Sequence, residues 1–177
     1  MSQICYVIIA SLLKKNNHIR GLAKDLSINQ MTISRRIKEL EQKNVVDFRQ
    51  EGKNKVYFLK ESLEAGEHIK ILEHIKLINI VSKDPRIRRI TQEINKENKV
   101  KLAILFGSYA KDLQTKKSDI DIYIETVHPE LKKKIQLIDS KVNIKIGSFD
   151  KNNLLIKEII KNHIIIKGVE RYYELIY

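Results

Sequence analysis

A Gly-Ser pair and two aspartates stand close together in the stretch LFGSYAKDLQTKKSDIDIYIE, residues 105–125. Asp119 and Asp121 are two positions apart, so on a β-strand both carboxylates point to the same face of the sheet. Two neighbouring carboxylates repel each other unless a cation lies between them, and Mg²⁺ or Mn²⁺ prefers such oxygen ligands. One interpretation of the pair is a divalent-cation site, at which the metal would also take oxygens from a phosphorylated ligand.

The Gly-Ser pair, Gly107 and Ser108, follows the apolar run VKLAILF, which predicts a buried strand over residues 100–106. We expect the glycine to turn the chain and a helix to start at Ser108. Free backbone N–H groups at a helix start bind anions, and a glycine lets a phosphate group approach the backbone closely. The glycine, the serine and the two aspartates together predict a site for a phosphate-bearing ligand.

The aspartates also have a purely structural interpretation. On an exposed edge strand they would pair with the nearby Lys116 and Lys117 and carry no chemistry. Ile120, Ile122 and Ile124 alternate with the acids, so under either interpretation the opposite face of the strand is expected to enter a core.

The net charge of the chain favours a polyanionic partner. The 177 residues carry a formal charge of +12, and residues 1–61 alone hold 12 Lys and Arg against 6 Asp and Glu. Nucleic acid is the first candidate for such a balance, and a Lys-rich solvated surface is the alternative. The single cysteine, Cys5, excludes an internal disulfide, and its apolar surroundings favour a place in the core.

The elements expected in the first third of the chain have a recognisable order. Apolar periodicity predicts helices at residues 4–14, 20–28 and 30–43, with Ser27 or Asn29 as the N-cap of the third. Two β-rich runs around the polar EGKN then predict a hairpin. This order resembles a winged helix-turn-helix domain.

That resemblance implies double-stranded DNA as a partner, with the third helix in the major groove and the hairpin wing on phosphate. The residues expected to meet DNA are polar or basic side chains on these two elements: Thr32, Arg35, Arg36, Lys38, Arg49, Lys53 and Lys55.

The whole chain is expected to have an α+β fold in three parts. These are a winged helix-turn-helix domain (1–61), a helical connector (62–83) that could pair with itself in a homodimer, and a small α/β domain with a mixed sheet (84–177). No run of 18 apolar residues occurs, so we expect no membrane association and a cytoplasmic location.

The segment GSYAKDLQTKKSDIDIYI resembles the signature of the nucleotidyltransferase superfamily related to DNA polymerase beta, in its minimal form. Some minimal nucleotidyltransferases are the antitoxin half of a toxin–antitoxin pair and adenylylate their partner. The resemblance implies that Gly107 and Ser108 hold a nucleoside triphosphate and that Asp119 and Asp121 are the catalytic, metal-binding acids. It also implies transfer of a nucleotidyl group to a hydroxyl of a protein or an RNA.

Two positions depart from the pattern of that family. Asp112 stands where the family turn has a second glycine, and Asn143 stands where active members have a third carboxylate. Three hypotheses therefore stay open: an active transferase with a DNA-binding half, a non-catalytic transcriptional regulator, and an antitoxin-like protein that binds a toxin-like partner.

Overall fold

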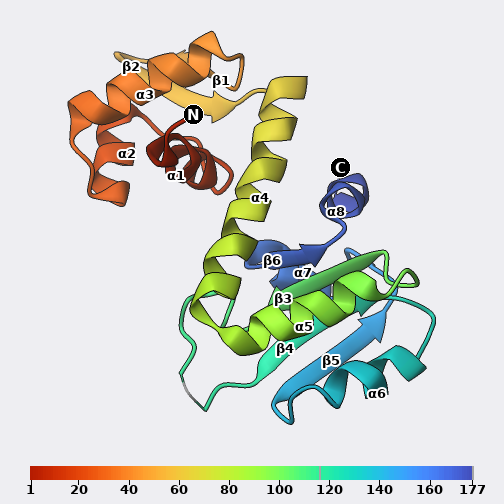
Figure 1. Cartoon of the computed structure of the whole chain (residues 1–177). Helices are drawn as coiled ribbons and strands as arrows, with labels where there is room; N and C mark the ends of the chain where they lie inside the picture. The colour runs from red at the N-terminus through yellow and green to blue at the C-terminus, as the bar shows by residue number, and fades with distance from the viewer. Residues whose placement is uncertain (116, 177) are drawn as a thin grey trace. The chain divides into compact units, whose positions relative to one another are not determined.

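The chain divides into two compact units, Met1–Leu72 and Glu73–Tyr177, in a computed structural model that describes residues 1–115 and 117–176. The division falls inside the long helix α4 (Leu63–Lys83), so this helix contributes residues to both units (Figure 1). The domain limits at residues 61 and 83 stay a prediction.

The first unit is a winged helix-turn-helix domain, as the sequence predicts. Its elements are α1 (Gln3–Leu12), α2 (Ile19–Leu26), α3 (Gln30–Gln42), β1 (Val46–Glu51) and β2 (Asn54–Leu59). Ile33, Ile37 and Leu40 of α3 are fully buried, because their spacing places them on one helical stripe that faces the core.

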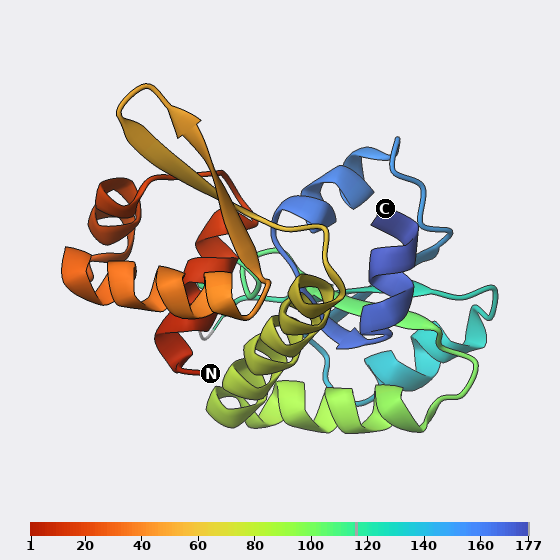
Figure 2. The same ribbon diagram turned by 90° about the horizontal axis from the view of Figure 1, so that it is seen from above.

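The turn between α2 and α3 separates the roles of the two candidate capping residues. The side-chain oxygen of Asn29 accepts a hydrogen bond from the Met31 N–H at 2.8 Å, so Asn29 is the N-cap of α3. Ser27 instead ends α2 in a left-handed conformation, with φ 53°. The hairpin turns at Gly52, with φ 58°, and extends away from the helices of its unit (Figure 2).

The second unit is built around a mixed sheet, which confirms the expected fold class. Its elements are α5 (Pro85–Lys96), β3 (Leu102–Phe106), β4 (Ile120–Glu125), α6 (Glu130–Gln136), β5 (Val142–Gly147), α7 (Leu154–Lys161), β6 (Ile164–Lys167) and α8 (Val169–Ile176). Over the described residues the strand order is β5-β4-β3-β6, in which β4 and β5 are parallel and the other pairs are antiparallel.

Helices cover both faces of this sheet (Figure 1). Ile120, Ile122 and Ile124 pack in the core that contains α5 and α6, whereas Tyr123 packs in the core that contains α7 and α8. Since both faces are buried, β3 is apolar along its whole length rather than alternating.

The short strand β6 is not expected from the sequence. Its isoleucines are buried next to β3, but an apolar run of three residues has no period that distinguishes a strand from a helix end.

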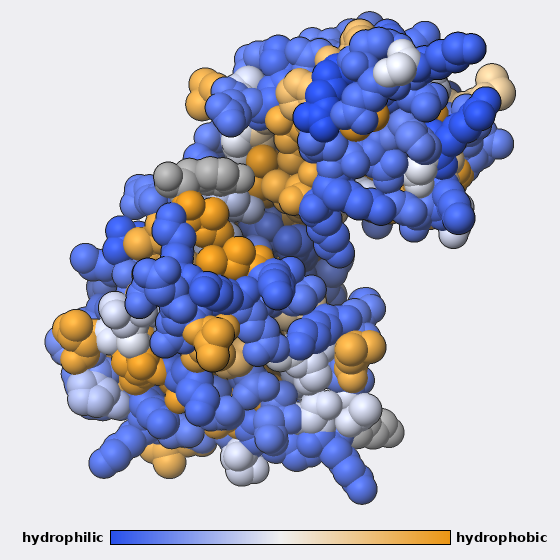
Figure 3. Space-filling model, turned by 180° about the vertical axis from the view of Figure 1, so that it is seen from behind, coloured by the Kyte–Doolittle hydropathy of each residue, from blue (hydrophilic) through white to orange (hydrophobic). Residues whose placement is uncertain are grey.

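Among residues 1–115 and 117–176, no helix is long and apolar enough to cross a bilayer. On the face drawn in Figure 3, hydrophilic residues cover most of the surface, and the hydrophobic ones gather in small separate groups.

Candidate functional site

The Gly-Ser turn forms directly after β3. Gly107 has φ 71°, a conformation that favours glycine. The Leu113 N–H donates to the Ser108 carbonyl at 3.0 Å, and the Asp112 N–H donates to the Tyr109 carbonyl at 3.4 Å. These two bonds, with Asp112 at φ 55°, are the pattern that closes a helix end.

The expected helix from Ser108 is therefore wrong. The segment makes a single turn that ends at Asp112, because this residue adopts the left-handed conformation in which the chain cannot continue as a helix. Asp112 thus keeps the backbone conformation for which a glycine is the usual residue, and adds an exposed side chain.

The two aspartates lie beside this turn. Asp121 is the register partner of Phe106 at the end of β3, and a Cβ atom on Gly107 would lie 2.6 Å from Asp121 Oδ2. Gly107 is therefore required both for the turn and for the approach of this carboxylate. Asp119 directly precedes β4 and is exposed, whereas Asp121 is partly buried.

The edge-strand interpretation of these acids is wrong, because β4 lies between β5 and β3 in the sheet. Of the two lysines that this interpretation would pair with them, Lys117 is exposed and Lys116 lies outside the described residues.

Asn143 is the direct neighbour of Asp121 on the parallel strand β5. The two residues are register partners, and the Asn143 amide donates to Asp121 Oδ1 at 2.8 Å. An amide at this position supplies a hydrogen-bond donor to Asp121 without adding charge. Across the described part of the chain, no group of three or more His, Cys, Asp and Glu side chains could hold a metal ion.

The donor set still fits a divalent cation that arrives with a phosphate. Asp119 and Asp121 supply two carboxylates on one side of the strand, and phosphate oxygens would complete the hard oxygen shell that Mg²⁺ or Mn²⁺ requires. Asn143 directs its N–H₂ group, rather than its oxygen, at Asp121, so it supplies no anionic ligand.

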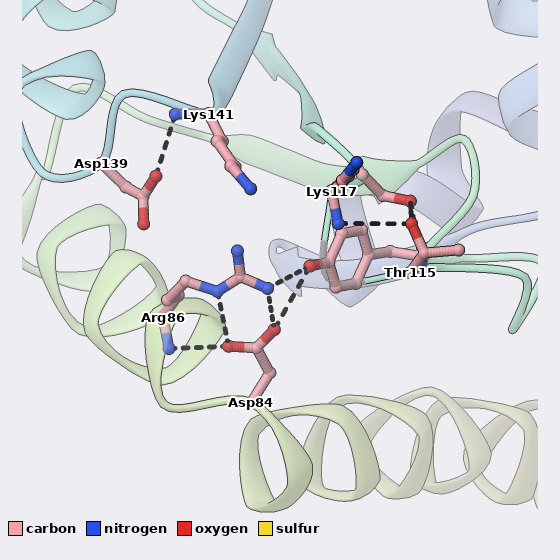
Figure 4. Close-up of polar contacts among 8 residues, drawn as sticks. Asp84, Arg86, Thr115, Lys117, Asp139 and Lys141 are labelled. Carbon is pink, nitrogen blue, oxygen red and sulfur yellow. Dashed lines mark hydrogen bonds and ion pairs between the residues drawn. The ribbon is translucent and has the colours of Figure 1, made fainter.

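Residues at the start of α5 hold the Gly-Ser turn from the other side. Arg86 donates to both Asp84 oxygens, at 3.2 and 2.7 Å, and to the Tyr109 hydroxyl at 2.6 Å. Hydrogen bonding from Arg86 holds the pKa of Asp84 below its ordinary value, and burial raises the pKa of Tyr109. In Figure 4 the Lys141 side chain points toward the same region as Arg86.

Sequence reasoning missed this contact. The only local signal is Asp84 before Pro85, the usual order of an N-cap and the first helical residue, and the Asp84 carboxylate does accept from the Arg86 N–H. The partner hydroxyl lies 25 residues further along the chain.

A surface pocket of about 390 Å³ lies at the opposite end of the sheet. It is lined by Glu125 and Gly147, the last residues of β4 and β5, together with basic residues that include Lys101 and Arg171. None of the predicted site residues lines it.

The first unit presents a basic face of α3. Arg35 and Lys38 are exposed, and Thr32 is half-buried on the same helix. Arg36 is also half-buried and donates to Glu39 at 2.7 Å, which draws its charge toward its own helix.

The hairpin carries the remaining basic residues. Lys53 lies in the exposed turn, and Arg49 forms an exposed ion pair with Glu51 at 2.6 Å. The Lys55 ammonium lies 3.8 Å from the centre of the Phe48 ring, a cation–π contact that holds its stem along the wing.

Comparisons with known proteins find similarities that each cover part of the chain. A family model described as a nucleotidyltransferase domain matches residues 86–171. Two Methanocaldococcus jannaschii proteins named putative protein adenylyltransferases are 40% identical over 92 residues and 36% identical over 95 residues. Each match spans 51% of this chain and 89% of the relative.

A third protein of that organism, an uncharacterized HTH-type transcriptional regulator, is 40% identical over 52 residues. These residues are 29% of this chain and 13% of the length of the regulator. Two solved repressors align at 18% identity each. BigR of Xylella fastidiosa has a TM-score of 0.37 over 47% of this chain and 78% of its own. AdcR of Streptococcus pyogenes has a TM-score of 0.38 over 54% of this chain and 78% of its own.

Proposed function

The chain belongs to the nucleotidyltransferase domain family, and from this membership we propose a DNA-binding protein whose second unit binds a nucleoside triphosphate with Mg²⁺ or Mn²⁺. The observation that carries the proposal is the contact between the Gly-Ser turn and Asp121. A Cβ on Gly107 would lie 2.6 Å from Asp121 Oδ2, so a phosphate on the turn and a cation on the carboxylate would be neighbours.

In this proposal the turn binds the triphosphate of the ligand, and the two aspartates bind its cation. The backbone N–H groups of the turn and the Ser108 hydroxyl bind the triphosphate, because Gly107 leaves the backbone open to it. Asp119 and Asp121 hold the cation, which supplies the positive charge that lets a triphosphate approach two carboxylates. Asp112 adds an exposed negative charge at the end of the turn and weakens binding.

Nucleotidyl transfer needs a general base, which the site does not supply. An acceptor hydroxyl must lose its proton, attack the α-phosphorus and displace pyrophosphate. The Asn143 amide cannot take that proton, and its N–H₂ group is already directed at Asp121. The proposed activity is therefore nucleotide binding with slow transfer, at about 10²- to 10⁴-fold below the rate that a general base would allow.

The DNA-binding part of the proposal rests on α3 and the wing. The exposed Arg35 and Lys38 would enter the major groove, and Lys53 at the turn of the hairpin would contact phosphate. Thr32 and Lys55 would contribute from half-buried and ring-stacked positions. Arg36 and Arg49 would first have to leave their ion pairs with Glu39 and Glu51.

A second candidate function is transfer to a protein. The names of the two similar adenylyltransferases favour a protein hydroxyl as the acceptor, and an antitoxin-like role would make that acceptor a toxin-like partner. We also propose that the chain forms a homodimer through α4.

The test combines two measurements on the full-length chain. Incubation with α-labelled nucleoside triphosphates and Mg²⁺ or Mn²⁺ should show retained nucleotide with little label transferred to protein or RNA. Gel-shift titration with duplex DNA at low salt should show binding. A chain that binds neither nucleotide nor duplex contradicts the proposal, and rapid covalent labelling of a co-purified protein favours the second candidate.

A further inference from the structure

The Tyr109 hydroxyl joins the Gly-Ser turn to the start of α5. Tyr109 is 2% exposed and packs in the same core cluster as Ile87 and Ile90 of α5. Its hydroxyl accepts from Arg86 Nη2 at 2.6 Å and lies 3.3 Å from Asp84 Oδ2. Arg86 in turn forms two parallel bonds to Asp84, a geometry that fixes the plane of the guanidinium group.

The position of the Gly-Ser turn depends on the contact of Tyr109 with Arg86 and Asp84, because the turn is short. It has only one helical turn, closed by the bonds to the Ser108 and Tyr109 carbonyls, so no following helix anchors it. The Lys111–Glu158 ion pair holds it from α7, but both side chains are more than one-third exposed, and such pairs contribute little. The buried Tyr109 ring and its hydroxyl, with Ala110 packed against the same core cluster, thus anchor residues 107–113.

We propose that Arg86, held between Asp84 and Tyr109, is a positioning residue that fixes the Gly-Ser turn in its nucleotide-binding conformation. Asp84 directly follows the last residue of α4 and caps α5, so the turn is fixed to the junction of these two helices. This role rests on the proposed function, because the ligand of the turn is the proposed nucleoside triphosphate. Arg86 and Asp84 themselves do not contact the nucleotide. Figure 4 shows the two labelled partners and their bonds.

The first test replaces Tyr109 with phenylalanine, and Tyr123→Phe is the matched control. Tyr123 is equally buried in the same unit, and its hydroxyl donates to the Gly147 carbonyl at 2.8 Å, toward the other end of β5. Tyr109→Phe loses the hydroxyl bonds to Arg86 and Asp84, and Tyr123→Phe loses the bond to Gly147, so both variants should lose thermal stability. Only Tyr109→Phe should weaken the binding of ATP with Mg²⁺, by about two- to tenfold, which is the order of a net hydrogen-bond contribution.

Amide hydrogen exchange tests the position of the turn without any nucleotide. The Lys111 and Leu113 N–H groups, which both donate to Ser108, should exchange about two- to tenfold faster in Tyr109→Phe and at the wild-type rate in Tyr123→Phe. Asp84→Asn should give the same faster exchange, although asparagine retains the capping oxygen, because it loses the charge that aligns Arg86.

The outcomes separate the two proposals. Wild-type exchange rates in both Tyr109→Phe and Asp84→Asn overturn the positioning role, and so does equal nucleotide affinity in Tyr109→Phe and Tyr123→Phe. If the wild type binds no nucleotide, the proposed function fails, and the exchange rates alone then decide whether Arg86 holds the turn.

Discussion

Replacing Asn143 with aspartate restores the third carboxylate and changes the charge of the site by one unit. The new oxygen would lie near the position of the amide nitrogen, 2.8 Å from Asp121 Oδ1. Two unit charges at that separation repel by roughly 1.5 kcal/mol at the dielectric constant of water and roughly 6 kcal/mol at an effective value of about 20. A divalent cation between the carboxylates reverses this repulsion.

We therefore expect Asn143→Asp to lower the free energy of unfolding in EDTA by at least about 1.5 kcal/mol, and Mg²⁺ or Mn²⁺ to restore most of the loss. Metal-dependent transfer of label from a nucleoside triphosphate should rise by about 10²-fold or more. Chemical denaturation with and without metal measures the first effect, and labelling of protein or added RNA measures the second.

Asn143→Ala is the control for this substitution. It removes the hydrogen bond to Asp121 but adds no charge, so its loss of stability should be the same with and without metal. If the stability of Asn143→Asp is also independent of metal, the residue does not share a cation site with Asp121. If wild type transfers rapidly and the substitution changes nothing, another group takes the proton.

Three further predictions follow from the same structure. The logarithm of the association constant for duplex DNA should fall with the logarithm of the salt concentration at a slope of roughly −5 if six phosphates are neutralised. Lys53→Ala with Lys55→Ala should weaken binding to all sequences alike, and a salt-independent affinity contradicts the DNA-binding role. Asp112→Gly should raise the free energy of unfolding by roughly 0.5 kcal/mol in urea denaturation, because glycine adopts φ 55° without strain; a loss of stability would show that the side chain has a stabilising contact. Hydrogen bonding from Arg86 holds the pKa of Asp84 below its ordinary value, so this stabilisation is present above the unfolded-state pKa and is lost as pH falls through the folded-state pKa. Asp84→Asn should therefore lose less stability than wild type over that acid range.

The sequence predicts those parts of the fold that depend on local periodicity. Alternation on β4 correctly places Ile120, Ile122 and Ile124 in a core with the aspartates on the other side, and the stripe on α3 correctly selects its buried residues. The spacing of Asp119 and Asp121 follows the strand period, whereas Gly107 is selected as a turn residue after a strand and Asn143 by the family resemblance.

Long-range contacts and short elements are not visible in the same way. The register of β4 and β5 pairs Asp121 with Asn143, but only the three-dimensional structure shows that the amide donates to the carboxylate. The contact of Tyr109 with Asp84 and Arg86 joins two elements whose sequences carry no mark of each other. The helix expected from Ser108 fails because a non-glycine residue, Asp112, adopts a left-handed conformation that no local pattern announces.

Calorimetric titration with ATP, on wild type and on the double substitution Asp119→Asn with Asp121→Asn, tests the proposed metal-dependent nucleotide site. The asparagines keep the shape of the acids, and an oxygen at position 121 can still accept from Asn143. We expect wild type to bind ATP only with Mg²⁺ or Mn²⁺, and the double variant to bind at least about tenfold more weakly with metal. In EDTA the variant should bind at least as well as wild type, because the repulsion between carboxylates and triphosphate is gone. Equal metal-dependent affinity in the two proteins would show that Asp119 and Asp121 hold no cation, and no binding of any nucleoside triphosphate by folded wild type would show that the second unit has no nucleotide site.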